Sequence, residues 1–274
     1  MRLLITGATG FAGRHLTSYC AEQGHEVHAL VRPGREGAVV PTATAHPADL
    51  RDGRGLARLV EGLAPDAVAH LAGASSVGSS FGDPLGTWEV NLGGTLAVLE
   101  ALREAAPETR VLVVSSGEIH GRVPLEDLPV GPDTPLRPLS PYGASKGAAD
   151  LAAAQYLAAY GLPALRVRAF NHVGPGQGPR FVLPNVARQI AQAEHDGRDA
   201  VEVRVGNVDT RRDFTDVRDM VRAYLLVIER GDPDTIYLAC SGRSRHQSRV
   251  SARVVSIGIS GVHPVSSRSR AGEP

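Results

Sequence analysis

Short apolar runs alternate with longer amphipathic stretches from the start of the chain to about residue 170. The apolar runs predict β-strands at residues 1–5, 26–31, 67–71, 110–115 and 164–170. The stretches between them predict helices at residues 14–23, 55–62, 88–105 and 142–160. Because parallel strands are joined through crossover helices, this alternation predicts an α/β fold, a doubly wound parallel sheet with helices on both faces.

A glycine-rich loop joins the first predicted strand to the first predicted helix. It reads Thr6-Gly7-Ala8-Thr9-Gly10-Phe11-Ala12-Gly13. Glycines at positions 7, 10 and 13 allow a tight turn, a close approach of the backbone to a pyrophosphate and close packing of the helix on the strand. The free N–H groups at the start of the helix would face the phosphates. We therefore expect a dinucleotide site, the alternative being a plain glycine-rich turn.

The end of the second predicted strand indicates which dinucleotide binds. NAD-binding folds usually place an acidic residue there to hold the ribose 2′-hydroxyl. This strand is instead followed by Arg32 and Arg35, and a guanidinium group suits the 2′-phosphate of NADP. NADP(H) is the preferred cofactor and NAD(H) the alternative, in which case the two arginines would be solvated loop charges.

Tyr142 and Lys146 lie four residues apart where a loop becomes a helix, with Pro141 at the entry. An i, i+4 pair shares one side of a helix. A free tyrosine titrates near pH 10, and we expect the neighbouring ammonium to lower the pKa of the phenol enough for proton transfer at neutral pH. The spacing alone is weak, because surface helices carry such pairs by chance.

Several ordered motifs together resemble the extended short-chain dehydrogenase/reductases, which modify nucleotide sugars. The glycine loop and Tyr142-x-x-x-Lys146 are accompanied by Asp49-Leu50, His70-Leu71-Ala72-Gly73, Asn91 in Val-Asn-Leu-Gly-Gly-Thr, and Ser115-Ser116. Residues 168–177 and 206–216 look most like the members that act on GDP-sugars, the GDP-mannose 4,6-dehydratases and the GDP-4-keto-6-deoxy-mannose reductases. Residues 212–219 favour the reductases. The resemblance runs from residue 1 to about residue 242.

The resemblance implies a Rossmann fold and a set of catalytic residues. Ser116 would hydrogen-bond the reacting sugar oxygen, Tyr142 would protonate it, and Lys146 would bind the nicotinamide ribose. Glu118 matches the carboxylate of the dehydratase acid–base pair, but reductases carry a glutamate there as well. Gly117 stands before it and has no proton to exchange, which disfavours the dTDP-glucose type of dehydratase.

The same resemblance assigns binding residues and domains. Cofactor contacts are expected from Gly7, Thr9, Gly10, Phe11, Ala12, Gly13, Arg32, Arg35, Asp49, Leu50, Leu71, Ala72, Gly73, Tyr142, Lys146, Phe170 and Val173. Substrate contacts are expected from Ser76, Asn171, Arg180, Asn185 and Arg212. Residues 1–173 would form the NADP-binding domain with the catalytic residues. Residues 174–242 would form a small, incomplete substrate-binding region and cover the sugar nucleotide.

The last part of the chain departs from the pattern of the family. Residues 243–274 are rich in Arg and Ser, and Glu273 is the only acidic residue after Asp234. Two interpretations stay open, a reading-frame change that replaced the native ending and a divergent or disordered tail. In either case we expect part of the substrate-binding region to be missing.

Composition limits the kinds of partner and the cellular location that we expect for this protein. The 274 residues carry 29 basic and 29 acidic side chains, so the formal net charge is zero and gives no reason to expect nucleic-acid or membrane binding. Two cysteines make no disulfide framework, and no apolar run approaches membrane-spanning length. Because the chain enters its first predicted strand directly, we expect no signal peptide. We expect a cytoplasmic enzyme without a metal, a homodimer in which residues 88–105 and 149–160 form either the interface or a core face.

Three functions remain open at this point. The first is NADPH-dependent reduction of the C4 ketone of a GDP-4-keto-6-deoxy-hexose. The second is a GDP-mannose 4,6-dehydratase or a nucleotide-sugar C4 epimerase, in which the dinucleotide is reoxidised within each cycle. The third is a truncated dinucleotide-binding protein without catalysis.

Overall fold

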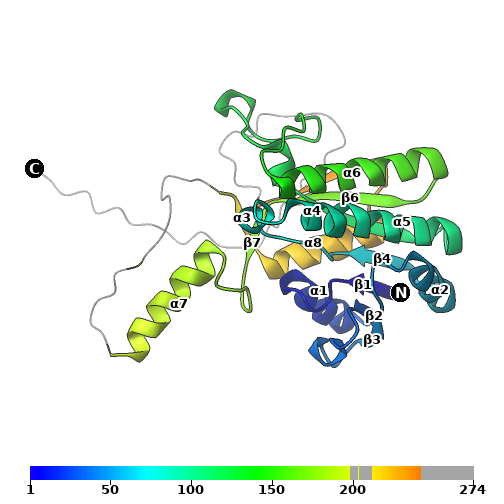
Figure 1. Cartoon of the computed structure of the whole chain (residues 1–274), viewed down its shortest axis with the longest axis horizontal. Helices are drawn as coiled ribbons and strands as arrows, with labels where there is room; N and C mark the ends of the chain where they lie inside the picture. Colours follow the sequence, from blue (N-terminus) through cyan, green and yellow to red (C-terminus); the bar gives the residue numbers. More distant parts are fainter. Residues whose placement is uncertain (198–202, 204–211, 242–274) are drawn as a thin grey trace, which may run out of the picture.

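A parallel β-sheet forms the centre of the molecule (Figure 1). The computed structural model describes residues 1–197, 203 and 212–241, and within them the sheet has seven strands. In spatial order they are β3 (Thr44–Pro47), β2 (Glu26–Val31), β1 (Arg2–Thr6), β4 (Ala67–His70), β5 (Arg110–Ser116), β6 (Ala164–Ala169) and β9 (Ile236–Ala239). All pairings are parallel. The predicted doubly wound α/β fold is confirmed.

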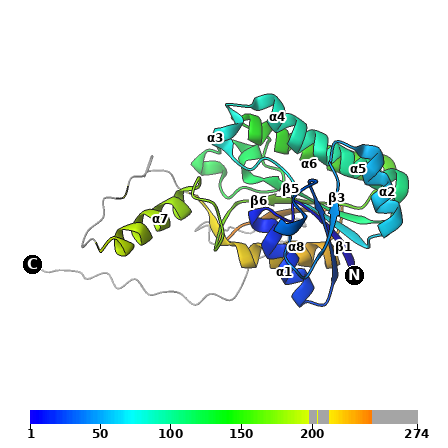
Figure 2. The ribbon, with the colours of Figure 1, turned by 60° about the horizontal axis from the view of Figure 1, so that its bottom comes forward.

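Helices cover both faces of the sheet (Figure 2). One face carries α1 (Phe11–Glu22) and α8 (Val217–Arg230), and the other carries α2 (Gly53–Leu63), α5 (Gly94–Ala105) and α6 (Pro141–Tyr160). Each layer buries its own apolar core against the strands. The strand sequences are apolar on both sides because both faces are covered.

The order of the strands places a switch point between β1 and β4. The chain runs outward from β1 through β2 to β3, and then returns to β4 on the other side of β1. Thr6 at the end of β1 lies opposite His70 at the end of β4. Ligands of open α/β sheets bind beyond the carboxyl ends of the strands at such a reversal. The candidate site is therefore expected at this edge.

The helix predicted over residues 88–105 is corrected by the structure. It begins earlier, as α4 (Pro84–Trp88), passes through a π-helical turn at Glu89–Gly93, and continues as α5. Asp83 caps the start by accepting a hydrogen bond from Gly86 N at 3.0 Å. A π turn inserts an extra residue into the helix, often at functional sites, and hydrophobic periodicity does not reveal it. A further short helix, α3 (Val77–Ser80), precedes it.

The segment from 174 to 215, expected to break the alternation, also contains a helix. This is α7 (Val182–His195), which stands away from the sheet and its covering helices in both views (Figures 1 and 2). Ala193 is its buried residue. On either side of it lie β7 (Asn171–Val173) and β8 (Phe214–Asp216), which pair in parallel as a separate two-stranded sheet. Three 3₁₀ turns also lie in the described residues, at Glu36–Ala38, Gly117–His120 and Leu125–Asp127.

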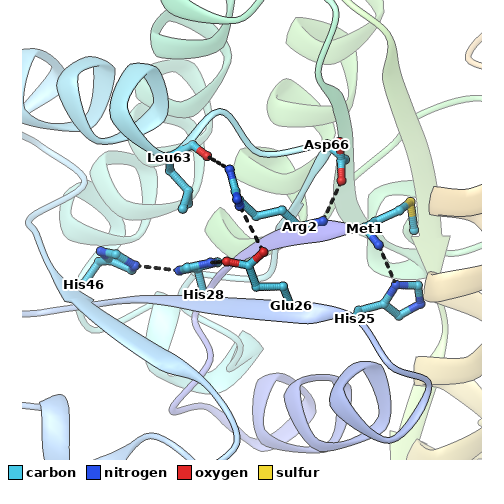
Figure 3. Close-up of polar contacts among 8 residues, drawn as sticks. All are labelled: Met1, Arg2, His25, Glu26, His28, His46, Leu63 and Asp66. Carbon is cyan, nitrogen blue, oxygen red and sulfur yellow. Dashed lines mark hydrogen bonds and ion pairs between the residues drawn. The ribbon is translucent and has the colours of Figure 1, made fainter.

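The opposite, amino-terminal edge of the sheet is tied together by polar side chains (Figure 3). Arg2 donates to Glu26 at 3.2 Å, and Glu26 accepts from His28 at 2.9 Å. His28 in turn shares a 2.8 Å hydrogen bond with His46 on β3. The network joins the starts of β1 and β2 to β3 and contains none of the expected site residues, so we assign it a structural role.

Some expectations fall outside the described residues or stay untested. The Arg- and Ser-rich tail at 243–274 lies outside them, as does most of the motif at 206–216. Within the described part of the chain no helix is long and apolar enough to cross a membrane. Helices α5 and α6 do bury core faces, but Leu96, Leu151 and Tyr160 remain exposed on them. The homodimer and the cytoplasmic location stay predictions.

Candidate active site

The segments expected to bind the dinucleotide meet where β1 and β4 end. Gly7 has a φ of +71°, and a Cβ on it would stand 2.6 Å from the backbone nitrogen of Ala72. The Ala72 amide donates to the hydroxyl of Thr6 at 3.2 Å. The loops 6–13 and 71–73 therefore form one continuous surface.

The start of α1 is suited to phosphate. Gly10 is the N-cap residue and no side chain caps the first turn, so its N–H groups and the positive end of the helix dipole remain for a ligand. Gly13 brings the helix against the loop, since a Cβ there would lie 2.1 Å from the carbonyl oxygen of Gly7. The residues present fit a dinucleotide pyrophosphate, held by the backbone of Thr9 to Gly13.

A cationic loop follows β2, where the 2′-phosphate of NADP was expected. Arg32 and Arg35 are both exposed, and the Arg35 amide donates to the Arg32 carbonyl at 3.0 Å. Arg51 adds a third guanidinium, 2.6 Å from the carboxylate of Asp49. Its hydrogen bonds lower the pKa of Asp49 to about 2, and the charge of Arg32 acts in the same direction. Asp49 is thus a paired carboxylate that lies beside arginine side chains.

Helix α6 positions Tyr142 in its first turn. Ser140 caps the helix by accepting from the Gly143 amide at 3.0 Å, and Pro141 occupies the first turn. Gly143 lets the helix approach the neighbouring loop, because a Cβ on it would lie 2.8 Å from the carbonyl oxygen of Glu118. Tyr142 is thereby held against the end of β5.

Ser116, the last residue of β5, is buried and hydrogen-bonds the phenol of Tyr142. Its oxygen also accepts from the Glu118 amide at 3.2 Å. The structure thus brings three of the four expected catalytic residues together. No metal-binding group of three or more His, Cys, Asp or Glu side chains lies among the described residues.

The expected effect of Lys146 on Tyr142 is corrected. Burial raises the pKa of Tyr142 above its usual value, the Ser116 hydrogen bond opposes that shift, and the charge of Glu118 adds to it. Desolvation disfavours the phenolate, and in the protein without ligands it outweighs the groups that favour this form. The phenol of Tyr142 is therefore neutral at physiological pH.

Lys146 is buried on the same helix and is the only lysine among the 274 residues. Burial lowers its pKa to about 8, and the charge of Asp150 acts in the opposite direction. A Cβ on Gly73 would lie 3.9 Å from Lys146 Nζ, which places the ammonium next to the cofactor loop. The chain uses arginine at every other basic position, yet arginine cannot titrate near neutrality as a lysine can.

A buried chain of hydrogen bonds links the cofactor loop to the catalytic helix. His70 bonds Thr6 at 2.8 Å and Thr95 at 3.1 Å, and Thr95 donates to the carbonyl of Asn91 at 2.6 Å. The Asn91 amide donates to Ser145 on α6 at 2.9 Å. Asn91 sits in the π turn, which directs its side chain inward, where its oxygen also accepts from the amide of residue 74 at 2.8 Å.

The expected substrate residues lie on several elements. Arg180 reaches the loop before α3 and donates to Ser75 at 3.2 Å, next to Ser76, which caps α3. Asn171 begins β7, Asn185 lies in the first turn of α7, and Arg212 is exposed just before β8. The hydrogen bond from Arg180 to Ser75 therefore brings Arg180 close to Ser76.

Aromatic rings connect the glycine loop to β7. Phe11 stacks on His172 with ring centres 5.9 Å apart and meets His15 edge-on at 5.5 Å. Phe170 packs against Gly117, where a Cβ would lie 2.9 Å from its ring. Val173 ends β7 and is partly buried. Leu50, likewise partly buried, packs against the core beneath α5.

Comparison with known proteins identifies the family. The sequence model described as GDP-mannose 4,6 dehydratase matches residues 4–272. The chain belongs to this family. The expected likeness to the extended short-chain dehydrogenase/reductases is confirmed, and with it the expectation of an NAD(P)-dependent enzyme.

Relatives within the GDP-mannose 4,6-dehydratase family differ in their reactions. The GDP-6-deoxy-D-mannose reductase of Pseudomonas aeruginosa is 39% identical over 244 residues, which are 89% of this chain and 76% of that protein. The GDP-mannose 4,6-dehydratase of Yersinia enterocolitica is 32% identical over an alignment of 275 positions, which covers 94% of this chain and 73% of that protein. A solved structure of RMD from Pseudomonas aeruginosa complexed with NADPH superposes with a TM-score of 0.77 at 38% identity, covering 88% of this chain and 77% of that one.

Sequence reasoning noted Asn91 and Thr95 only as parts of a family motif and assigned no role to Ser145. Each is a small polar residue on a helix face that otherwise packs in the core, and that mismatch is a usable signal. It also missed Asp150, a carboxylate in a helix rich in alanine, one turn after Lys146. That Lys146 is the one lysine of the sequence was a further sign that this position needs a lysine, and a count of residue types shows it.

Proposed function

We propose that the protein reduces the C4 ketone of a GDP-4-keto-6-deoxy-hexose to an alcohol with NADPH. The observation that carries the proposal is the contact of Tyr142 with Ser116 at the end of β5, where the phenol can give its proton to the oxygen of a bound ketone. A reduction needs a proton donor for the developing alkoxide, whereas an oxidation of the C4 hydroxyl needs a base. The 39% identity to a GDP-6-deoxy-D-mannose reductase supports reduction.

Each residue of the site then has one task. Ser116 donates a hydrogen bond to the C4 oxygen and orients the ketone toward Tyr142. Bound NADPH supplies the hydride that C4 accepts. Tyr142 gives its proton to the oxygen, so that the ketone becomes an alcohol and a phenolate remains. The nearby Lys146 ammonium stabilises that phenolate until solvent restores its proton.

The preference for NADP(H) rests on the loop after β2. Arg32 and Arg35 are exposed there and no acidic residue ends the strand. The similar RMD structure was solved with NADPH. NAD(H) remains the alternative, and replacing both arginines by glutamine should raise the KM for NADPH by at least tenfold while changing that for NADH little.

Dehydration of GDP-mannose is the second candidate, and Glu118 is the observation that favours it. Its charge reaches Tyr142, as a carboxylate next to the reacting sugar would. A dehydratase needs this group to remove a proton at C5, but a reductase does not. We expect Glu118→Gln to lower reductase turnover less than tenfold. A loss of a hundredfold or more would instead favour the dehydratase.

One assay separates the candidates. The protein is given NADPH with either GDP-mannose or the 4-keto-6-deoxy product, and reduced cofactor and sugar are followed together. Loss of one NADPH per ketone consumed supports the reductase. Ketone made from GDP-mannose without net loss of NADPH supports the dehydratase. Cofactor binding without turnover on either sugar supports the non-catalytic alternative.

The division into a cofactor domain at 1–173 and a substrate region at 174–242 belongs to the same proposal. Helix α7 would take part in covering the nucleotide sugar, since its first turn follows Arg180 closely. The homodimer is proposed to form through α5 and α6, where Leu96, Leu151 and Tyr160 are exposed. Sedimentation of the purified protein tests the dimer.

A further inference from the structure

Asp150 carries a charge in the core beneath the catalytic helix. It lies on α6 one turn after Lys146 and its side chain is fully buried. Arg168 on β6 holds the carboxylate with two hydrogen bonds, at 3.0 and 3.4 Å, and Arg166 lies 3.9 Å away. Buried charges are rarely kept without a partner or a task, and here the partner is visible.

The ion pair is rigidly placed. Arg168 also donates to the carbonyl oxygen of Pro132 at 2.7 Å, in the loop that leads to α6. Its guanidinium is thus fixed between the sheet, the helix and that loop. Because Asp150 is held by Arg168, its distance from Lys146 is set by the fold rather than by the movement of a flexible side chain.

We propose that Asp150 is a positioning residue for Lys146, and that its carboxylate, anchored by Arg168, keeps the buried lysine in its ammonium form beside Tyr142. The charge acts through space from the next turn of the helix. Arg168 moderates it, because a guanidinium bound to the carboxylate offsets part of its field. The pair therefore sets how much ammonium charge the site holds at neutral pH.

The surrounding charges are few. Lys146 interacts with the charge of Asp150 on its own helix and lies near His70 on β4, and His70 is neutral because burial lowers its pKa to about 3. Asp150 faces Arg166 and Arg168 on β6, and its charge also acts to raise the pKa of His120, against the larger effect of burial. Glu118 acts on Tyr142. Among these groups Asp150 is the one whose charge raises the pKa of Lys146, against the larger effect of burial.

The single lysine makes a direct test feasible. Protein grown with lysine labelled with carbon-13 at Cε gives one lysine side-chain resonance, and its shift against pH reports the titration of Lys146 alone. The variants are Asp150→Asn, Arg168→Gln and the double variant Asp150→Asn/Arg168→Gln. Glu100→Gln is the matched control, since the half-buried Glu100 also pairs with an arginine, Arg103, and its other contact with α6 is to Tyr156, ten residues after Lys146.

Opposite shifts are expected from the two single variants. Asp150→Asn should lower the midpoint of the Lys146 titration by about one pH unit, since it removes the favourable charge and frees Arg168. Arg168→Gln should raise it, and the double variant should lie below the wild type but above Asp150→Asn. Glu100→Gln should leave it unchanged.

A purely structural ion pair would give a different result. It would lower the melting temperature of the single variants while leaving all four midpoints at the wild-type value, and that outcome would overturn the proposal. If Asp150→Asn does not fold, an unchanged midpoint of the Lys146 titration in Arg168→Gln and in the double variant would overturn the proposal instead. A midpoint that falls in Arg168→Gln also contradicts it.

The catalytic consequence rests on the proposed reduction, but the titration does not. If the protein reduces the sugar ketone, the alkaline limb of kcat should move to lower pH in Asp150→Asn and to higher pH in Arg168→Gln. If no turnover is found, the proposed function fails while the titration still decides the role of Asp150.

Discussion

At Tyr142, burial and neighbouring charges decide which form of the phenol meets the substrate. The buried phenol keeps its proton, and Ser116 holds the hydroxyl at the end of β5. Lys146 lies one turn along α6, with its own pKa lowered by burial to about 8. A neutral acid next to a cation is the arrangement that reduction of a ketone requires, because the proton is given and the resulting anion is stabilised at once.

Replacing Tyr142 by Phe tests this arrangement. We expect kcat to fall by about 10²–10⁴-fold, because the proton donor is lost, while the affinity for NADPH changes little. Steady-state rates and fluorescence titration of NADPH measure the two effects. Tyr160→Phe is the control, since Tyr160 is exposed at the far end of the same helix. Comparable loss in both variants would contradict a specific role for Tyr142.

Single residues were predictable where a motif carried the chemistry. The family motifs pointed to Ser116 at the end of a strand and to Tyr142 and Lys146 four residues apart on a helix, and the structure has them on those elements, while their catalytic roles stay predictions. The direction of the Tyr142 pKa did not follow, because it depends on how deeply α6 packs against the loop at Glu118. The ion-pair partner of Asp150 could not be predicted from the sequence either, since Arg168 lies on another element, 18 positions later in the chain.

Among the elements, the β1–α1 turn is the one whose shape depends most on glycine. A Cβ on Gly13 would lie 2.1 Å from the Gly7 oxygen and 2.8 Å from Ala8 Cα. Both are backbone atoms, so neither can make room for a Cβ unless the backbone itself shifts. Helix α1 can therefore pack close to the loop and present its first turn to phosphate only while residue 13 has no side chain.

We expect Gly13→Ala to destabilise the protein by about 2–3 kcal/mol and to weaken NADPH binding by more than tenfold. Gly62→Ala is the matched control, because a Cβ on Gly62 in α2 meets open space. There alanine should stabilise the helix by about 0.5–1 kcal/mol. Urea unfolding and NADPH titration check both variants. Equal behaviour of the two would show that crowding at the loop does not matter.

The five strands and four helices that periodicity predicted are buried on defined faces, whereas β3, β9 and α8 were not predicted. The π turn at Glu89–Gly93 was not predicted either, since its cause is the inward Asn91 side chain and its bonds to other elements. Helix α7 was missed because its sequence lies between Pro- and Gly-rich stretches and it packs little against the core. Local sequence signals do not record such tertiary contacts.

For the molecule as a whole, buried histidines link stability to pH. Burial lowers the pKa of His70 to about 3 from an ordinary value of 6.5, and also lowers the pKa values of His46, His120 and His172. The unfolded chain takes up these protons below pH 6.5, whereas the folded protein does not. The stability that neutral His70 contributes is therefore complete above pH 6.5 and is lost progressively down to about pH 3.

The free energy of unfolding should accordingly fall between pH 7.5 and 5.5. His70 alone accounts for about 1.4 kcal/mol of that loss, the work of one proton taken up by the unfolded chain one pH unit below 6.5. Urea unfolding of the wild type and of His70→Gln at the two pH values measures it. The variant should lose about 1.4 kcal/mol less than the wild type. An identical loss would show that His70 is not held neutral.

The transfer of deuterium from NADPH that carries deuterium at both C4 positions of its nicotinamide tests the proposed reduction most directly. The labelled cofactor is incubated with the protein and a GDP-4-keto-6-deoxy-hexose, and the sugar is examined by NMR and mass spectrometry. We expect one deuterium bound to C4 of the sugar for each NADPH oxidised, and incorporation that is about 10²–10⁴-fold slower when Tyr142 is replaced by Phe. Sugar that turns over without deuterium at C4, or ketone that accumulates from GDP-mannose while the cofactor stays reduced, would contradict it.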